Sequence, residues 1–331
     1  MSPLRHAAGA PASRILGIGA YEPARVVDNA EMCTLIDSSD EWIRQRTGIA
    51  ERRWASPDET LTVMSVRAAE EALAHAGLTA ADVDCVIMAT VTHFEQWPSL
   101  ACRVTAALGR PDLPAWDISA ACAGFCYGLA QADALIRAGA GRHVLVLAAD
   151  RLSDLTDLTD RTTAFLFADG AGAAVVGPSD VPGIGPTVWG GASDQANAIT
   201  QTLPWLDGVR QGTRPSIAMD GKKVFRWAMT DVAAKTRQAI EAAGLTPDDI
   251  DLFVPHQAND RITEAMLRGL GLPDRVLVSH NIERTGNTSA SSIPLALARL
   301  YADRLVPPGA ACLMVGFGAG LVYAGQVALL P

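Results

Sequence analysis

The sequence has 331 residues, of which 49% are hydrophobic and 19% are charged, and its formal net charge at pH 7 is −9. Such a composition is typical of a globular protein with a large buried core, and it excludes a disordered chain. The negative net charge argues against general nucleic-acid binding, and an acidic protein partner requires a local basic patch on which to dock. No apolar run approaches the roughly 18 residues that a membrane helix needs.

The N-terminus and the cysteines bear on cellular location. Residues 1–13 are predicted to form a flexible tail, because they contain no apolar stretch like that of a secretory signal. The six cysteines form no Cys-x-x-Cys pair. Reduced thiols in a cytoplasmic protein are therefore expected, and five of the six cysteines are expected to be small core residues.

Apolar runs that predict buried strands are interspersed along the chain with periodic segments that predict helices. In chain order the predicted elements are helix Thr62–Ala76, strand Val83–Ala89, helix Gly124–Ala138, strand His143–Ala148, strand Ala171–Val176, helix Lys223–Ala243, strand Leu252–Pro255, helix Arg261–Leu270, helix Ala290–Asp303 and strand Ala311–Val315. This succession of strands and helices is typical of an α/β protein.

One segment of the chain is echoed in its second half. Ala72–Asp84 reads ALAHAGLTAADVD and Ala239–Asp251 reads AIEAAGLTPDDID, at an offset of 239 − 72 = 167 residues. A second echo pairs the glycine-rich run that starts at Asp169 with the run that starts at Gly316. Two echoes in the same order favour an internal duplication over chance similarity.

The duplication predicts how the chain is divided. The two halves are expected at residues 14–178 and 215–331, joined by connecting loops at 179–214. Clefts between related halves commonly hold active sites, so we expect the site at their junction.

Cys122 stands between a strand-like run, Ala115–Ile118, and the helix predicted from Gly124. A thiol at a helix N-terminus has a lowered pKa, because the helix dipole and the unpaired amides stabilise the thiolate. The same amides can hold an oxyanion. Cys122 is thus a candidate nucleophile. From these residues alone, the alternative is a buried cysteine in a packing site of small residues.

Two polar segments of the second half are candidates to act with Cys122. His256 follows the strand that ends at Pro255 and enters a polar loop, although most single histidines are structural. Asn287 precedes the helix predicted from Ala290, where it serves either as a helix cap or as a neutral hydrogen-bond donor in the site.

The glycine run Gly316–Gly320 is predicted to form a tight turn that presents backbone amides. It lacks the Lys-Ser/Thr pair of a phosphate-binding loop and the acidic residue expected after a dinucleotide-binding motif. Cysteine proteases of the papain type also combine Cys, His and Asn, and the spacing of 256 − 122 = 134 residues fits them. Their local signature around the cysteine is absent, which argues against that class.

Motifs spread over almost the whole chain resemble the thiolase-fold condensing enzymes, and more narrowly β-ketoacyl-acyl carrier protein synthase III. In order they are Asp37-Ser-Ser-Asp-Glu-Trp42-Ile-Arg-Gln-Arg46-Thr-Gly-Ile, Ser119-Ala-Ala-Cys122-Ala-Gly-Phe, Asp160-Arg161-Thr, Phe167-Ala-Asp-Gly-Ala-Gly, Val254-Pro-His256-Gln-Ala-Asn259, Thr285-Gly-Asn287-Thr-Ser and Gly316-Phe-Gly-Ala-Gly. Other stretches are similar to actinobacterial and polyketide-priming members. The resemblance implies a thiolase-like fold, in which two duplicated α/β halves form an α-β-α-β-α core.

The resemblance also implies a two-stage reaction. Cys122 attacks an acyl-CoA, and the acyl-enzyme then condenses with malonyl-acyl carrier protein as CO₂ is lost. His256 and Asn287 would donate hydrogen bonds to the enolate oxygen, and the amides of Cys122 and Ala319 would hold the other oxyanion. The family usually has glycine where this sequence has Ala319.

Binding residues are carried over from the same family. The residues expected to bind CoA and its pantetheine arm are Trp42, Arg46, Arg161, Phe225 and Asn259. The basic residues expected to meet an acidic carrier protein, or else to form an ordinary solvated face, are Lys222, Lys223, Arg226, Arg261 and Arg268. Trp97 matches a position that reaches into the acyl pocket of a partner subunit, and its alternative role is interface packing. Leu100 and Cys102 are its neighbours.

A second reaction stays open, in which a relative moves the cysteine-bound acyl group to another carrier, a hydroxyl or an amine without decarboxylation. The presence of both His256 and Asn287 favours condensation. A thiolase is disfavoured, because Gly316–Gly320 contains no second cysteine. We expect no cofactor, no metal and a homodimer. The starter acyl group and the choice between fatty-acid initiation and polyketide priming stay open.

Overall fold

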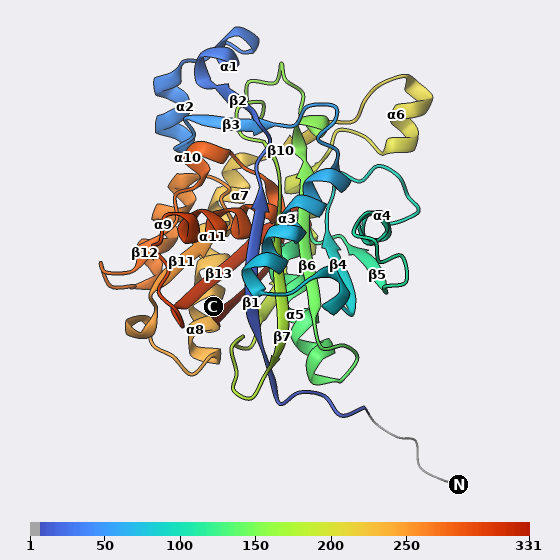
Figure 1. Cartoon of the computed structure of the whole chain (residues 1–331). Helices are drawn as coiled ribbons and strands as arrows, with labels where there is room; N and C mark the ends of the chain where they lie inside the picture. The colour runs from blue at the N-terminus through green and yellow to red at the C-terminus, as the bar shows by residue number, and fades with distance from the viewer. Residues whose placement is uncertain (1–6) are drawn as a thin grey trace.

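The structure is a computed structural model that describes residues 7–331. Two five-stranded mixed sheets lie on the two sides of a central helix layer (Figure 1). The first sheet has the order β1-β7-β6-β4-β5, with β1 (Ala12–Tyr21), β4 (Cys85–Ala89), β5 (Ala115–Ile118), β6 (Val144–Arg151) and β7 (Asp169–Ser179). The second has the order β12-β11-β13-β14-β8, with β8 (Val188–Gly191), β11 (Leu252–Pro255), β12 (Leu277–Val278), β13 (Ala311–Gly318) and β14 (Val322–Leu329).

The two sheets follow the same plan. Read from β1 in one sheet and from β8 in the other, each has two antiparallel pairs followed by two parallel pairs. β4 and β11 begin 252 − 85 = 167 residues apart, as the sequence echo requires. Each of these strands follows a 3-10 turn closed by the same capping box, Thr79 with Asp82 and Thr246 with Asp249.

The second sequence echo is out of register. The run from Asp169 forms β7, and the counterpart of β7 by sheet order is β14. The run from Gly316 instead covers the end of β13 and the turn that leads into β14. The similarity of the two runs therefore comes from the glycines that both segments need, not from equivalent positions.

Helices complete a five-layer α-β-α-β-α arrangement. The outer face of the first sheet carries α3 (Leu61–Ala76) and α4 (Leu100–Ala107), the central layer holds α5 (Gly124–Arg137) and α11 (Ser292–Ala302), and the outer face of the second sheet carries α7 (Gly221–Trp227), α8 (Ala233–Ala242) and α9 (Asp260–Leu270). Both faces of each sheet are buried. In β13, for example, Cys312 and Met314 face the central helices, whereas Leu313 and Val315 face the outer layer.

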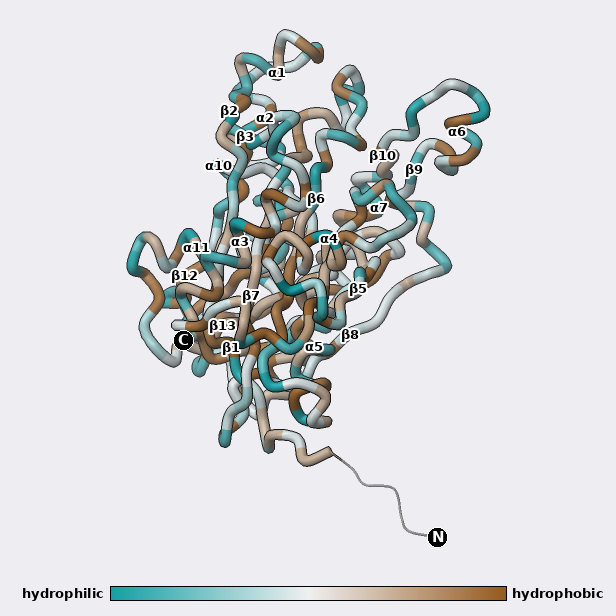
Figure 2. Tube along the Cα trace, turned by 45° about the vertical axis from the view of Figure 1, so that its right-hand side comes forward, coloured by the Kyte–Doolittle hydropathy of each residue, from teal (hydrophilic) through white to brown (hydrophobic). Residues whose placement is uncertain are grey.

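Two further groups of elements surround one end of this core. The first is a cap of β2 (Arg25–Asp28), α1 (Asn29–Leu35), α2 (Asp40–Thr47), β3 (Glu51–Trp54) and α10 (Ile282–Thr285), whose apolar residues form a separate cluster. The second is an arm of β9 (Ile199–Gln201), α6 (Trp205–Gln211) and β10 (Ile217–Met219). Figures 1 and 2 both show α6 standing away from the body, while hydrophobic residues gather along the central strands (Figure 2).

Every strand and helix predicted from the sequence is present, with small shifts at the ends. The predicted helix Lys223–Ala243 is α7 and α8 joined by a π-helical turn, Ala228–Val232. The predicted helix from Ala290 begins as a 3-10 turn, Ser289–Ser291, and continues as α11. None of the helices in residues 7–331 is both long and apolar enough to cross a membrane.

The stretch 179–214, predicted as connecting loops, is more structured than expected. It supplies β8, the edge strand of the second sheet, because the antiparallel edge of β14 needs a partner there. It also supplies β9 and α6. The division into halves at 14–178 and 215–331 stays a prediction. Of the predicted tail 1–13, residues 1–6 lie outside the described residues, and the remainder runs into β1.

Candidate active site

The structure brings Cys122, His256 and Asn287 to one cavity of about 260 Å³. Cys122 follows β5 and His256 follows β11, so both come from the carboxyl ends of strands that run in parallel ladders. Asn287 precedes the 3-10 turn that leads into α11. Three segments far apart in the sequence therefore meet at one cavity.

Cys122 lies in the 3-10 turn Ala121–Ala123, directly before α5. Ala121 has the left-handed φ of 45°, which turns the chain sharply ahead of the cysteine. β13 passes so close that a Cβ on Gly318 would lie 3.0 Å from the Sγ, the Cβ and the backbone nitrogen of Cys122. Gly318 is thus required by this close approach.

The pKa of the Cys122 thiol differs from the sequence expectation. Burial raises this pKa to about 12. The position before α5 is the predicted one, but enclosure by protein disfavours the thiolate more than the helix N-terminus favours it. In the free protein the sulfur is therefore protonated near neutral pH.

His256 is held in one tautomer by Ser292. Its ring Nδ1 lies 2.7 Å from Ser292 Oγ, and this oxygen accepts a hydrogen bond from the backbone of Gln257 at 3.2 Å. When the hydroxyl of Ser292 donates to Nδ1, Nε2 carries the ring proton and is a donor toward the cavity. Burial lowers the pKa of His256 to about 3, which keeps the ring neutral.

Asn287 has its side-chain amide oriented by the backbone. Its Oδ1 accepts a hydrogen bond from the N–H of Ser289 at 3.0 Å, which leaves the NH₂ group as a donor on the side of the cavity. Its own backbone pairs with the segment before β7 through Leu166 and Ala168. The N-cap position of the 3-10 turn is Thr288, so Asn287 is held one residue ahead of it by its bond to Ser289, and its role as a donor stays a prediction.

The glycine run is divided between a strand and a turn. Gly316 and Gly318 end β13, and Ala319 begins the turn to β14. A Cβ on Gly316 would lie 2.8 Å from the Cα of Ala123, so this strand end is pressed against the turn that carries Cys122. Gly318 and Ala319 line the cavity beside the sulfur.

The residues predicted to bind CoA are divided between the cavity and its surroundings. Phe225 and Asn259 line the cavity. Asn259 caps α9 and donates from Nδ2 to the carbonyl of Arg46 at 3.1 Å, which joins α9 to α2. The guanidinium of Arg46 stacks on the ring of Trp42 at 5.8 Å from its centroid. Arg161 lies at the surface, 4.0 Å from a carboxylate oxygen of Asp37.

The predicted docking residues form a patch on α7 and α9. Lys222, Lys223 and Arg226 line a shallow surface pocket together with two acidic residues of the same helical segment. Arg261 stacks on Phe225 at 5.7 Å, and Arg268 is exposed further along α9. Basic side chains therefore lie next to the part of the cavity that Phe225 lines.

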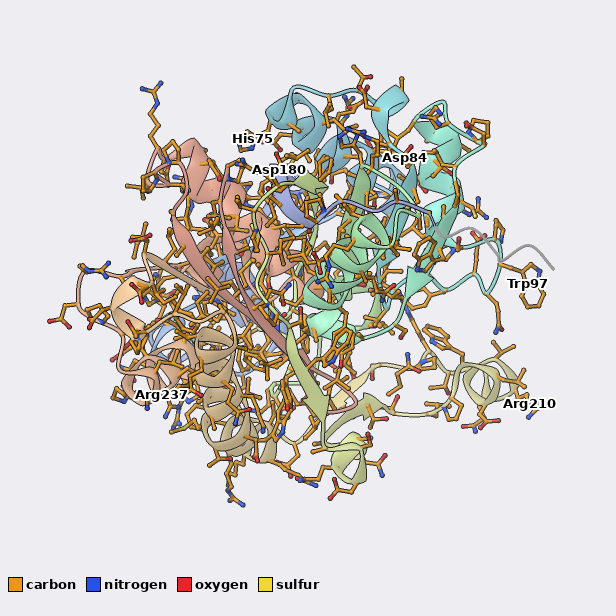
Figure 3. The ribbon with its side chains drawn as sticks, turned by 90° about the horizontal axis from the view of Figure 1, so that it is seen from below. His75, Asp84, Trp97, Asp180, Arg210 and Arg237 are labelled. Carbon is orange, nitrogen blue, oxygen red and sulfur yellow. The ribbon has the colours of Figure 1, made fainter. Side chains whose placement is uncertain are left out.

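Trp97 does not line the cavity within this chain. Its side chain is 78% exposed, and Figure 3 shows it projecting from the same side of the molecule as Arg210 of α6. Leu100 is buried in the first outer layer, and Cys102 is exposed. The prediction that Trp97 shapes an acyl pocket needs a second subunit and stays a prediction.

Several residues of the site have no signal in the sequence analysis. The cavity wall is largely apolar, and the residues that the sequence analysis did not name include Leu152, Leu155, Leu166, Ile199, Ile217 and Met219. They come from loops and short strands without a clear period, so only the tertiary structure gathers them. Asp260, Glu264 and His280 have ligand atoms within 4.8 Å of one another, but the ion pair between His280 and Asp260 accounts for this group.

Comparison with known proteins identifies the family. A family model for 3-oxoacyl-[acyl-carrier-protein] synthase III matches residues 116–193, and the model for its C-terminal part matches residues 240–329. The β-ketoacyl-[acyl-carrier-protein] synthase III of Streptomyces glaucescens is 52% identical over 333 residues, which cover 100% of both chains. The chain belongs to the β-ketoacyl-[acyl-carrier-protein] synthase III family. It is accordingly a condensing enzyme of the acyltransferase type.

Solved structures agree with this assignment. The priming β-ketosynthase of the R1128 polyketide biosynthetic pathway superposes with a TM-score of 0.97 at 50% identity and covers 100% of this chain and 99% of that chain. The synthase III of Aquifex aeolicus is 38% identical, with a TM-score of 0.89 and coverage of 96% and 100%. These neighbours confirm the predicted thiolase-like fold of the enzyme. OleA of Xanthomonas campestris, at 19% identity, shares the fold alone.

Proposed function

We propose that the enzyme loads a starter acyl group from acyl-CoA onto Cys122 and then condenses it with malonyl-acyl carrier protein to give a β-ketoacyl-carrier protein. The observation that carries the proposal is the meeting of the partly buried thiol of Cys122 with two neutral side chains, the His256 imidazole and the Asn287 amide, in one apolar cavity. Neutral donors suit an enolate in a place that excludes water.

In the first stage the sulfur of Cys122 attacks the carbonyl carbon of the acyl-CoA thioester. The carbon–sulfur bond to CoA breaks, and CoA leaves as its thiol once it has taken up a proton. The developing oxyanion lies near the backbone amides of Cys122 and Ala319, which both border the cavity. Preorganised amides stabilise such a charge without reorganising.

In the second stage the malonyl group loses CO₂, and the electron pair of the broken bond forms a thioester enolate. His256 and Asn287 donate to the enolate oxygen. The enolate carbon then attacks the acyl carbonyl on Cys122, a carbon–carbon bond forms, and the cysteine sulfur leaves. No cofactor or metal takes part in this scheme.

The binding residues are proposals of the same kind. Trp42, Arg46 and Arg161 are assigned to the nucleotide of CoA, because a stacking surface and two cations suit adenine and phosphates. Phe225 and Asn259 border the path of the pantetheine arm. The carrier protein is proposed to dock on the basic patch, which consists of Lys222, Lys223, Arg226, Arg261 and Arg268.

We further propose that the enzyme is a cytoplasmic homodimer. β5 is an edge strand of the first sheet, and unpaired edges favour pairing with another chain. Exposed apolar side chains gather on the same side of the fold, with Trp97 on the loop before α4 and Leu206 and Val209 on α6. Trp205 of α6 packs against Phe94 of that loop at 4.5 Å between ring centroids, so the two segments are neighbours.

The name of the R1128 priming ketosynthase favours polyketide priming over fatty-acid initiation.

The test of the two-stage reaction is mass spectrometry of the enzyme with a panel of acyl-CoAs, followed by addition of malonyl-carrier protein. We expect the acyl mass on Cys122, its absence in Cys122→Ala, and CO₂ release with β-ketoacyl product. Mass retained in Cys122→Ala contradicts the acyl-enzyme. Acylation without CO₂ release instead supports the non-decarboxylating transferase.

A further inference from the structure

Arg52, on β3, is one of the largest fully buried side chains, and the proposed reaction does not use it. Its Nη1 donates to the carbonyl of Val27 at 3.0 Å, and its Nη2 donates to Asn29 Oδ1 at 2.7 Å and to the carbonyl of Phe165 at 3.1 Å. All three acceptors are uncharged oxygens. Because it is costly to bury a cation that is bonded only to neutral groups, the place of this side chain requires an explanation.

The guanidinium of Arg52 stays charged near neutral pH. Burial lowers the pKa of Arg52 to about 10, which is still well above neutral. Hydrogen bonds from an ionised donor are roughly twice as strong as those between neutral groups, so the charge strengthens the three bonds. An apolar side chain of similar size would fill the space, but it would leave the three buried oxygens without their donor. The side chain therefore holds particular oxygens in place.

Arg52 and Trp54 together hold the segment that precedes β7. They are two residues apart on β3, so their side chains point to the same, buried face of the strand. Trp54 Nε1 donates to the carbonyl of Phe167 at 3.3 Å, just as Arg52 donates to the carbonyl of Phe165. The carbonyl between these two belongs to Leu166, and it is bonded from another element.

The partner of that middle carbonyl is the backbone of Asn287. Its N–H donates to the carbonyl of Leu166 at 2.9 Å, and its own carbonyl accepts from the N–H of Ala168 at 2.9 Å. Gly286 lies so close to β3 that a Cβ on it would be 2.9 Å from the Cβ of Arg52. The backbone of Asn287 is therefore bonded to the segment that Arg52 holds, and the residue before it packs against Arg52 directly.

The other bonds of the guanidinium are anchored in the cap. Asn29 is 1% exposed, and besides accepting from Arg52 it donates from Nδ2 to Asp40 Oδ1 at 2.8 Å and to the carbonyl of Ile49 at 2.9 Å. Asp40 begins α2, the helix proposed to bind the nucleotide of CoA. Arg52 therefore joins a firmly bonded part of the cap to the segment that carries the backbone of Asn287.

We propose that Arg52 is a positioning residue for Asn287. Its guanidinium fixes the carbonyl of Phe165 against the cap, and the segment held in this way sets the place of the Asn287 amide in the cavity. The inference rests on the proposed function, in which this amide acts in decarboxylation and not in acylation. A displaced amide should therefore slow the release of CO₂ and spare the acylation of Cys122.

The test measures two rates per folded molecule, the acylation of Cys122 by acyl-CoA and the release of CO₂ from malonyl-carrier protein. Arg52→Lys keeps the charge but loses the planar fork that reaches separate acceptors. We expect its release of CO₂ to fall about tenfold and its acylation rate to equal that of the wild type. Trp54→Phe removes only the bond to the carbonyl of Phe167, so it should show a smaller loss in the same direction. It tests the inference even if Arg52→Lys does not fold.

Arg53→Lys is the matched control. Arg53 is the next residue of β3, so its side chain points to the opposite face, where it bonds to Glu51 at 3.3 Å. Both rates of this variant should match the wild type. A combined variant, Arg52→Lys with Asn287→Ala, separates positioning from a general defect. It should release CO₂ as slowly as Asn287→Ala alone, because no amide is left to position.

Three outcomes overturn the inference. The first is that Arg52→Lys and Trp54→Phe match the wild type in both rates. The second is that acylation and CO₂ release fall to the same extent, and the third is that the losses of Arg52→Lys and Asn287→Ala add in the combined variant. A wild-type enzyme that is not acylated, or that releases no CO₂, instead refutes the proposed function, and the inference falls with it.

Discussion

At the scale of single residues, hydrogen bonds that are remote from any substrate decide what each polar group can do. Ser292 fixes the tautomer of His256, and the backbone of Ser289 fixes the amide of Asn287. Without these contacts either side chain could present an acceptor to the cavity. With them, both can present a donor, as the proposed enolate oxygen would require.

Asn287→Ala tests whether the side-chain amide of Asn287 acts in decarboxylation and not in the acylation of Cys122. We expect acylation of Cys122 to survive, because the amide is assigned to the enolate and not to the first oxyanion. Decarboxylation of malonyl-carrier protein should fall by about 10²–10³-fold, the usual loss for one oxyanion donor. Acyl mass and CO₂ release are measured on the same sample. Loss of both stages to the same extent would contradict the assignment.

The burial of neutral His256 predicts how stability depends on pH. Its folded pKa of about 3 lies below the ordinary pKa of histidine, 6.5, so the unfolded chain binds more protons and stability falls as the pH drops below 6.5. The contribution of this residue is about 1.4 kcal/mol per pH unit in that range. Urea unfolding of the wild type and His256→Gln between about pH 7 and pH 5 measures it, and the wild type should lose more stability. Parallel curves would disprove the prediction.

At the scale of elements, β13 has two structural roles. It is a central strand of the second sheet, and its last residues press against the turn that carries Cys122. The glycines at 316 and 318 allow this close contact, since a side chain on either would collide with the turn. The apparent glycine loop is therefore a strand end shaped to fit the nucleophile.

Gly318→Ala should disturb this fit. The added Cβ would lie 3.0 Å from the sulfur, so we expect stability to fall by about 1–3 kcal/mol, as in other overpacked sites. Acylation of Cys122 should fall by more than about tenfold, because a displacement of the reacting atom is costly. Chemical denaturation and acylation kinetics measure the two effects.

Gly269→Ala is the control for that substitution. Gly269 lies on α9, where an added Cβ meets nothing closer than 3.9 Å, so alanine should stabilise the helix by up to about 1 kcal/mol. Its acylation rate should equal that of the wild type. A Gly318→Ala enzyme that behaves like this control would show that the contact with Cys122 is unimportant.

At the scale of the whole molecule, charge distribution decides how partners approach. The protein carries a net charge of −9, so an acidic carrier protein is repelled except where basic residues gather. The basic patch on α7 and α9 lies beside Phe225, at the cavity. An approach over this patch would deliver a pantetheine arm directly to the site.

Reversal of two charges, with Lys222→Glu and Arg226→Glu together, should raise the KM for malonyl-carrier protein by about tenfold, with a smaller effect on kcat. The increase should diminish at high salt, where exposed charges are screened. Arg142→Glu reverses a single charge at the turn before β6, on a different element, and it is compared with Lys222→Glu alone. An equal rise of KM in this control would refute a specific docking patch.

The sequence by itself was sufficient for the long elements of the core and for naming candidate reacting groups. Buried strands such as Leu252–Pro255 are apolar on both faces, and the echo 167 residues apart reported the duplication, because related halves keep the same turn and capping box. Cys122, His256 and Asn287 stood out because their residue types stand at the ends of strands and the starts of helices. A candidate reacting group can be found from the sequence alone when its residue type and its position between predicted elements both suit the chemistry.

Only the tertiary structure decided the electrostatics and the surroundings of these groups. The helix N-terminus beside Cys122 suggested a lowered pKa, but burial contributed by both halves raises it. The edge strand β8 looked like a loop, because its four residues gain their order from pairing with β14. The sequence shows which polar and ionisable side chains the protein has. Packing in the tertiary structure decides which of them are charged, how they are oriented and which of them lie close together.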